Sequence, residues 1–378
     1  MSKKFSIFLT SLFCAFIGGM AVISLLLPDK DFSPLENRFL QKPPKLSADS
    51  LKSGKFMEDA EDYVSDHLLG RDLWVAMKAW SERLSGKKEN NGVYFGSHNT
   101  LINRVETPAP SKLETDMGYV DALVGNVSVP VYFGLIPSAA EIWKDRLPAG
   151  APTADEKSII DQLYFSTGAS TIDLYGALAS HSGEDIYYRT DHHWTSLGAF
   201  YGANAIFEAL GLEPLRLEDY QKTTVTDQFN GTSFSTSGVR WLPPDQIDTY
   251  VPDDGIQVTS WFKGTPEEGS LYVDSYLDVK DKYSYFLGGR QPLCVVEKAG
   301  STGPKALIIR DSYSDSLTPF LTERFSEIPL IDPGTTCPAL RITWNKITST
   351  LCLCCTVLQI SPPTQICSCC PGKTARLL

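Results

Sequence analysis

The chain has 378 residues and a formal net charge of −11, and 42% of its residues are hydrophobic. This acidic balance argues against nucleic acid and anionic lipid as partners, because both repel a chain of the same charge. After an apolar start, about 300 residues remain, enough for one large domain or for one domain with an insertion. Only Cys14 and Cys294 occur before residue 333, so we expect no disulfide framework in that part of the chain.

Residues 1–30 are predicted to be a membrane-targeting segment. Lys3 and Lys4 precede an uncharged run, Phe5 to Leu27, which is long enough to cross a bilayer as a helix. A basic start and an apolar core also fit a cleavable signal peptide, but no clean small-x-small cleavage site follows. We therefore favour an uncleaved single-pass anchor with an extracytoplasmic remainder, and keep cleavage and secretion as the alternative.

Residues 31–110 are predicted to form a lead-in of helices and a hairpin. Helical spacing runs over residues 56–84 and is interrupted at Gly70. Asn91-Gly92 then opens a strand at 93–95, and Leu101-Ile102 is its expected hairpin partner.

Residues 111–332 are predicted to form one α/β domain. Up to residue 215, helical and strand-like patterns alternate at short intervals, which favours a parallel sheet with helices on both faces. Residues 216–300 break this rhythm with short Thr-, Tyr- and Val-rich segments, which predict a β-rich antiparallel insertion. Aromatic residues of this region could stack on sugar rings or could form a small core; they are Trp241, Trp261, Tyr272, Tyr276, Tyr283 and Tyr285.

The chain has five histidines, and two of them are adjacent, directly after Asp191. In an extended segment, residues i and i+2 point the same way, so Asp191 and His193 could share a face while His192 points elsewhere. A metal site would need a further ligand at nearby spacing, and the sequence offers none. A helix-capping role falls more naturally on Thr195 or Ser196, which begin an amphipathic pattern.

A nucleophile for this pair is offered by Ser312. It follows the short apolar run 306–310, and a serine where a buried strand meets the next loop is typical of α/β hydrolytic enzymes. We predict that Asp191 orients His193 and that His193 takes the proton of Ser312. Gly288 and Gly289 could lend backbone N–H groups to an oxyanion hole, or could form a turn.

Asp191-His192-His193-Trp194, preceded by Tyr187-Tyr188-Arg189-Thr190, resembles the signature of the bacterial DHHW proteins. These are similar to the alginate O-acetylation proteins and belong to the SGNH-hydrolase-like group, in which an Asp-x-His-Trp segment precedes the Asp-Ser nucleophile motif. Asp311-Ser312-Tyr313-Ser314 matches that second motif. The resemblance covers roughly residues 30 to 332 and implies an SGNH-hydrolase-like fold in which Asp311 and Trp194 support the site.

The resemblance also implies transfer or removal of an acyl group, usually acetyl, on an extracytoplasmic polysaccharide. An O-acetyltransferase would act on cell-envelope or exopolysaccharide sugars, with a membrane-bound acyltransferase as a candidate partner. A carbohydrate esterase would use the same triad with water as the acceptor, and a non-catalytic envelope protein would only bind glycan. The sequence contains no dinucleotide, P-loop or zinc-protease motif, so we expect no cofactor and no metal.

The segment 333–378 differs from the rest of the chain. It contains none of the 45 acidic residues and seven of the nine cysteines. Cys352-x-x-Cys355 and Cys367-x-x-Cys370 imitate a zinc ribbon, but the spacer is short and an exported domain would more readily oxidise them. We hypothesise a shifted reading frame after about Asp332, so that the final helix and apolar strand expected of a DHHW relative are missing.

Overall fold

A computed structural model of the chain describes residues 3–262 and 265–332, and the backbone of residues 351–357. Its internal contacts define two compact units. One comprises the described residues of Met1–Asn90 and Phe234–Trp241, and the other those of Asn91–Ser233 and Leu242–Leu378. All residues of the site described below belong to the second unit.

The first unit begins with a long apolar helix, α1 (Lys3–Leu26). Its mean hydropathy of 2.2 and its length would let it cross a membrane, and a signal sequence near the N-terminus has the same properties. The predicted interruption at Gly70 is confirmed, because α3 ends at Asp66 and Gly70, with φ of 67°, precedes α4. The other elements are β1 (Phe32–Ser33), β2 (Arg38–Phe39), α2 (Ala48–Lys52), α3 (Lys55–Asp66), α4 (Arg71–Leu84) and β3 (Glu89–Asn90).

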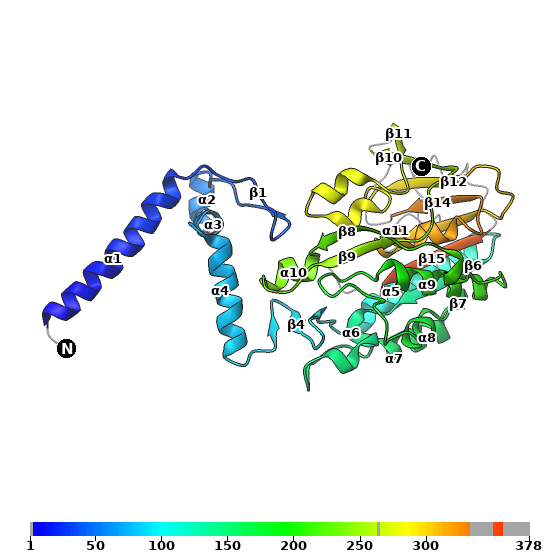
Figure 1. Ribbon diagram of the computed structural model, residues 1–378, viewed down its shortest axis with the longest axis horizontal. Coiled ribbons are helices and arrows are strands. Elements are labelled where there is room, and N and C mark those ends of the chain that lie inside the picture. The colour runs from blue at the N-terminus through cyan, green and yellow to red at the C-terminus, as the bar shows by residue number, and fades with distance from the viewer. Residues whose placement is uncertain (1–2, 263–264, 333–350, 358–378) are drawn as a thin grey trace. The chain divides into compact units, whose positions relative to one another are not determined.

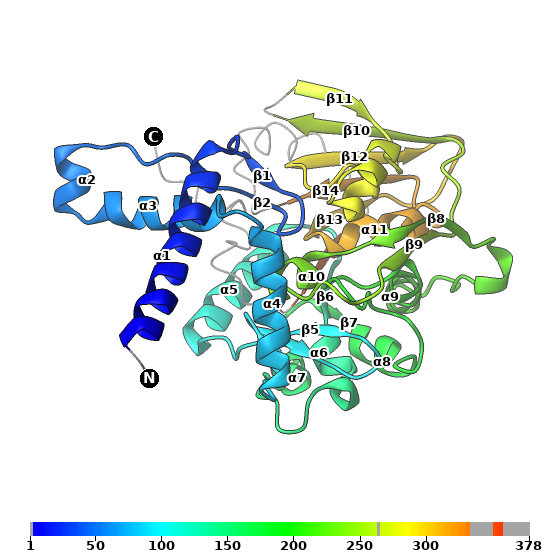
Figure 2. The ribbon, with the colours of Figure 1, turned by 60° about the vertical axis from the view of Figure 1, so that its left-hand side comes forward.

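The second unit is built on an eight-stranded sheet with the order β11-β10-β12-β14-β13-β15-β6-β7 (Figures 1 and 2). The strands from β14 to β7 pair in parallel, and those from β11 to β14 pair antiparallel. Their bounds are β6 (Val131–Ile136), β7 (Ser170–Ile172), β10 (Ile256–Phe262), β11 (Thr265–Gly269), β12 (Leu293–Lys298), β13 (Ala306–Arg310), β14 (Glu327–Ile331) and β15 (Leu351–Val357).

The sheet is therefore mixed, and the prediction of a parallel sheet is wrong for one side of it. Strands β10, β11 and β12 come from the region predicted as a separate β-rich insertion, yet they extend the main sheet. The connection from β10 to β11 is only a few residues long, and a connection this short can join only antiparallel strands. Two further strands of the region, β8 (Thr223–Phe229) and β9 (Asp245–Thr249), form a small antiparallel sheet of their own.

Helices contribute to apolar clusters on both faces of the main sheet. Successive residues of β13 alternate between the clusters, as the two-residue period of a strand requires: Ile308 lies in one, and Leu307 and Ile309 lie in the other. Helices α8, α9 and α11 contribute to the first cluster, and α5 and α7 to the second. The helices of this unit are α5 (Pro110–Asn126), α6 (Ala139–Ile142), α7 (Glu156–Ser166), α8 (Leu174–Ala179), α9 (Ser196–Ala209) and α11 (Tyr313–Leu321).

Strand β15 corrects one expectation about the tail. No strand is expected after residue 332, but the backbone of 351–357 pairs in parallel with β13 on one side and with β6 on the other. A run rich in Leu, Val and Cys is apolar enough for this central position whatever reading frame produced it. The frame hypothesis itself stays a prediction, and Cys337, Cys367, Cys369 and Cys370 lie outside the described residues.

A buried carboxylate lies just beyond the carboxyl end of β6. Glu156 is fully buried, and its Oε2 accepts hydrogen bonds from the backbone N–H and the hydroxyl of Ser138, at 3.2 and 2.5 Å. Its Oε1 has no hydrogen-bond partner among the described residues. Burial raises the pKa of Glu156 to about 7; the hydrogen bonds from Ser138 oppose this rise, and the nearby charge of Glu141 adds to it.

Replacing Glu156 with glutamine is expected to raise the free energy of unfolding at pH 8 by up to about 3 kcal/mol, since one pKa unit is worth about 1.4 kcal/mol. The ordinary pKa of a glutamate is 4.5. The folded protein therefore prefers the protonated form of Glu156. The stability that this preference contributes is fully present below pH 4.5 and is lost as the pH rises through about 7. Urea unfolding of the full chain in detergent at pH 5 and pH 8 measures the effect. The prediction would be contradicted if the free energy of unfolding changed equally between pH 5 and pH 8 in wild type and in Glu156→Gln.

Candidate active site

Ser312 stands between the end of β13 and the start of α11. It is the N-cap residue of this helix, with φ of −66° and ψ of −18°. The carboxylate of Asp311 accepts a hydrogen bond from the backbone N–H of Tyr313 at 3.0 Å, which closes the turn around the serine. The predicted position at the carboxyl end of a sheet strand is thus the one the structure has.

The histidine motif forms a tight turn between α8 and α9. The backbone N–H of Tyr188 donates to the carbonyl oxygen of His193 at 3.1 Å, and Tyr187 and Trp194 pair as an isolated antiparallel bridge. Thr195 caps α9, as predicted, by accepting a hydrogen bond from the N–H of Gly198 at 3.3 Å. The turn therefore ends in a fixed helix N-terminus.

Trp194 joins this turn to the nucleophile helix. Its indole is fully buried, and its Nε1–H donates to the carbonyl oxygen of Tyr313 and to the hydroxyl of Ser316, both at 3.0 Å. The first turn of α11 and the histidine motif are consequently held together by hydrogen bonds outside the reactive groups.

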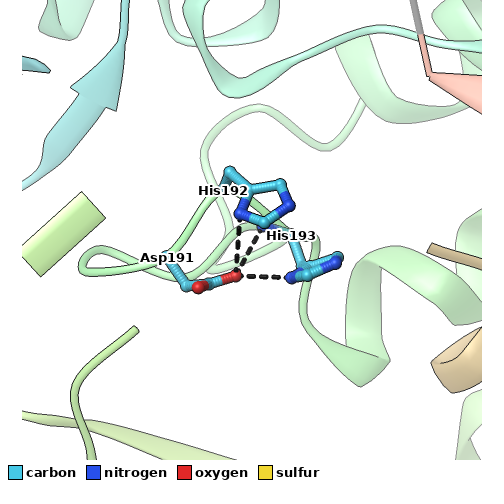
Figure 3. A group of neighbouring side chains, drawn as sticks. All are labelled: Asp191, His192 and His193. Atoms are coloured by element: carbon cyan, nitrogen blue, oxygen red, sulfur yellow. Dashed lines mark hydrogen bonds and ion pairs between the residues drawn. The ribbon is translucent and has the colours of Figure 1, made fainter. Parts of the chain in front are cut away.

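Asp191, His193 and Ser312 form one hydrogen-bonded series. His193 Nδ1 lies 2.6 Å from Asp191 Oδ1, and His193 Nε2 lies 2.7 Å from Ser312 Oγ (Figure 3 shows the Asp191 end). With Nδ1–H donating to the carboxylate, Nε2 is left as the acceptor for the serine hydroxyl. The arrangement can remove a proton from Ser312 and so create an oxygen nucleophile.

The remaining lone pairs of Asp191 are also occupied. Its Oδ1 accepts the backbone N–H of His193 at 2.9 Å, and its Oδ2 accepts the N–H and the hydroxyl of Thr232 at 2.7 and 2.9 Å. Burial alone would raise the pKa of Asp191, but the adjacent imidazoles and these hydrogen bonds outweigh it and hold the pKa well below its ordinary value. The carboxylate is therefore ionised wherever the imidazole can act as a base.

His192 does not point away from the site, contrary to prediction. Its ring centre is 3.9 Å from that of His193, and its Nδ1 is 3.6 Å from Asp191 Oδ1 (Figure 3). The alternation expected of an extended segment fails because these residues form a turn. Burial, together with the neighbouring His193, lowers the pKa of His192 to about 4, so the second imidazole is neutral at pH 7.

Asp191, His192 and His193 also place three potential metal ligands within 4.8 Å of one another. The 2.6 Å between Asp191 Oδ1 and His193 Nδ1 is the length of a charge-assisted hydrogen bond. Two ligands of a tetrahedral zinc ion, each about 2.0–2.1 Å from it, would lie about 3.3 Å apart. The geometry thus fits a shared proton better than a shared ion.

Three contributors to the site were missed by the sequence analysis. Gly231 and Thr232 lie some forty positions after the motif and hold Asp191, and a Gly-Thr pair alone gives no signal for such a role. Tyr283 was considered only as one of a group of aromatic residues that could stack on sugar rings or form a small core. The structure buries Tyr283 and Tyr285 in an aromatic cluster, which favours the core-packing interpretation. Within the first unit, Trp241 packs against Trp80 with the two ring planes tilted by 35°.

Gly288 and Gly289 lie in a tight turn. Their φ angles are 73° and 81°, a region that favours glycine, and the N–H of Gly289 donates to the carbonyl oxygen of Phe286 at 3.3 Å. That amide is already used within the turn. The oxyanion-hole role therefore stays a prediction.

The chain is similar to known proteins over the part that contains the site. A family model described as "DHHW protein" matches residues 120–331, which include both motifs. "Probable alginate O-acetylase AlgJ" of Pseudomonas putida is 23% identical over 215 residues, which is 52% of this chain and 54% of that protein. The chain therefore matches about half the length of this curated relative.

Solved structures share the fold. A DHHW family protein from Eubacterium siraeum aligns with a TM-score of 0.62 and 24% identity, covering 71% of this chain and 91% of the other. PatB1 of Bacillus cereus aligns with a TM-score of 0.57 and 19% identity, covering 69% of this chain and 94% of the other. At these identities the likeness establishes the fold alone.

Proposed function

The chain belongs to the DHHW protein family, and on this premise we propose that it is an extracytoplasmic O-acetyltransferase that modifies polysaccharide sugars. Its nucleophile is Ser312, its base is His193, and its orienting acid is Asp191. The observation that carries the proposal is the hydrogen-bonded series of these three side chains, with spacings of 2.6 and 2.7 Å.

The proposed reaction has two steps. In the first, His193 Nε2 takes the proton of Ser312 as Oγ attacks the acetyl carbonyl carbon of a donor, and the proton then passes to the departing donor group. In the second, His193 takes the proton of a sugar hydroxyl as that oxygen attacks the acetyl-serine ester, and the proton then passes to Oγ of Ser312, which leaves as the free hydroxyl. Asp191 stabilises the imidazolium that forms in each step.

The finer features of the proposal rest on the family and the first helix. An SGNH-hydrolase-like arrangement of the domain agrees with the position of Ser312 after β13. A polysaccharide acceptor agrees with the alginate O-acetylase description of the Pseudomonas putida relative. If α1 anchors the chain, the site lies outside the cytoplasm, where a membrane-bound acyltransferase could supply the acetyl group.

The test is acetyl turnover by the full chain in detergent. Wild type should release p-nitrophenol from p-nitrophenyl acetate, and added acceptor glycan should speed release and become acetylated. Ser312→Ala should lose this activity by about 10³-fold or more. Release that no acceptor glycan accelerates would identify an esterase, with water as the acceptor. Equal inertness of wild type and Ser312→Ala, with glycan still bound by both, would overturn the proposal in favour of a binding protein.

A further inference from the structure

We propose that Tyr283 is a positioning residue for His193, a role that rests on the proposed function. The phenol ring of Tyr283 stacks on the imidazole, with ring centres 3.8 Å apart and planes within 9° of each other. Its hydroxyl donates to the carbonyl oxygen of Ser312 at 3.1 Å and shares a hydrogen bond with the hydroxyl of Ser316 at 3.0 Å. One side chain thus touches both the base and the backbone of the nucleophile.

The stacking supplies a restraint that the hydrogen bonds of His193 lack. Bonds at Nδ1 and Nε2 hold two points of the ring, so the imidazole could still tilt about the line that joins them. A flat ring pressed against one face removes this freedom. Reaction rates depend steeply on such orientation, because a displacement of about 1 Å can cost about 10²-fold.

Tyr283 is itself held rigidly. It is buried at 4% exposure, at the start of the short 3-10 helix Lys282–Tyr285. Tyr188 packs against it in a T-shaped arrangement with an interplanar angle of 86°, and Phe286 packs beside it with ring centres 5.6 Å apart. These rings belong to one cluster with Phe229 and Ile247, so the wall behind the imidazole cannot move without disturbing that cluster.

The same contact favours the transition state of the proton transfer, in which positive charge develops on the imidazole. An imidazolium against the face of a phenol ring is stabilised by the negative potential of the ring. Tyr283 therefore restrains the ring before the proton transfer and stabilises the cation after it. Among the described residues, the other titratable groups against His193 are Asp191, His192 and Tyr313.

Labelling of Ser312 by phenylmethylsulfonyl fluoride tests the proposal without requiring the natural acyl donor. The serine oxygen forms a bond to sulfur, fluoride leaves with the bonding electrons, and His193 takes the proton. The second-order labelling rate of the full chain in detergent is followed by intact mass. We expect Tyr283→Phe to stay within about threefold of wild type and Tyr283→Leu to fall about 10- to 100-fold.

The matched control is Tyr285→Leu, which removes a buried tyrosine from the same 3-10 helix and cluster. It should label like wild type. For Tyr283→Leu, kcat for p-nitrophenyl acetate should fall with little change in KM. If Tyr283→Leu does not fold, Tyr283→Met takes its place.

The outcomes separate this proposal from the proposed function. If wild type and Ser312→Ala are equally unlabelled, the triad chemistry fails before Tyr283 is tested, and both proposals fall. If wild type is labelled, equal rates for wild type and Tyr283→Leu overturn the positioning role alone. A loss in Tyr283→Phe as large as that in Tyr283→Leu also overturns the stacking argument, because the hydroxyl would then be the required group.

Discussion

Asp191→Asn is expected to lower kcat for acetyl-ester turnover by about 10³- to 10⁴-fold with little change in KM, which is the usual effect of this change in a Ser-His-Asp triad. The geometry gives the reason. Oδ1 of Asp191 accepts from two groups of His193, and Oδ2 accepts from two groups of Thr232. An asparagine can offer an oxygen to only one of these pairs.

Either orientation of the new amide damages the site. If its NH₂ group faces His193, it donates to Nδ1, the imidazole proton moves to Nε2, and the acceptor for the Ser312 hydroxyl is lost. If NH₂ faces Thr232, it meets the backbone N–H donor of Thr232, and two buried donors oppose each other. The first orientation removes the base, and the second destabilises the loop that holds it.

Steady-state kinetics with p-nitrophenyl acetate measures this effect. Asp248→Asn is the matched control, because Asp248 accepts from Thr224 at 2.6 Å and pairs with Lys222 away from the triad. Its kcat should stay within about threefold of wild type, since surface substitutions of this kind are nearly neutral. A fall of less than tenfold in Asp191→Asn would mean that His193 does not depend on this carboxylate.

The positions of Asp191, His193 and Ser312 were predictable because each carries a local signal. A serine that closely follows an apolar strand belongs at the carboxyl end of that strand, and an Asp-x-His segment that ends in a capped helix belongs in a fixed turn. The orientation of His192 was not predictable. It depends on whether the segment is extended or turned, and four consecutive polar and aromatic residues do not distinguish the two.

The partners of the triad carry no comparable signal. Thr232 and Tyr283 meet Asp191 and His193 only through long-range packing, and nothing in their own neighbourhood distinguishes them from other threonines and tyrosines. The same holds for β10–β12, which fall in the region predicted to be antiparallel β structure, although neither their bounds nor their place in the main sheet was predicted. The local sequence pattern predicts a secondary-structure element, whereas tertiary packing decides which other elements it lies beside.

Gly231→Ala is expected to be the most damaging single-methyl change near the site. A Cβ built on Gly231 would lie 2.2 Å from both Cβ and Oδ2 of Asp191, well inside any real contact distance. Asp191 cannot withdraw, because it is buried and held by His193 and Thr232. The loop must therefore shift, and the N–H of Thr232 moves away from the carboxylate.

We expect Gly231→Ala to lower kcat by at least about 10²-fold, the cost of a displacement near 1 Å, and the free energy of unfolding by about 1–3 kcal/mol. Gly118→Ala is the control, because that glycine lies within α5 and an added Cβ would meet nothing within 4 Å. It should leave kcat unchanged and stabilise the helix by about 0.5–1 kcal/mol. Kinetics and urea unfolding of both variants measure the contrast. If Gly231→Ala kept the kcat of the wild type, Asp191 could move without loss of activity. Its close packing against Gly231 would then not be required for activity.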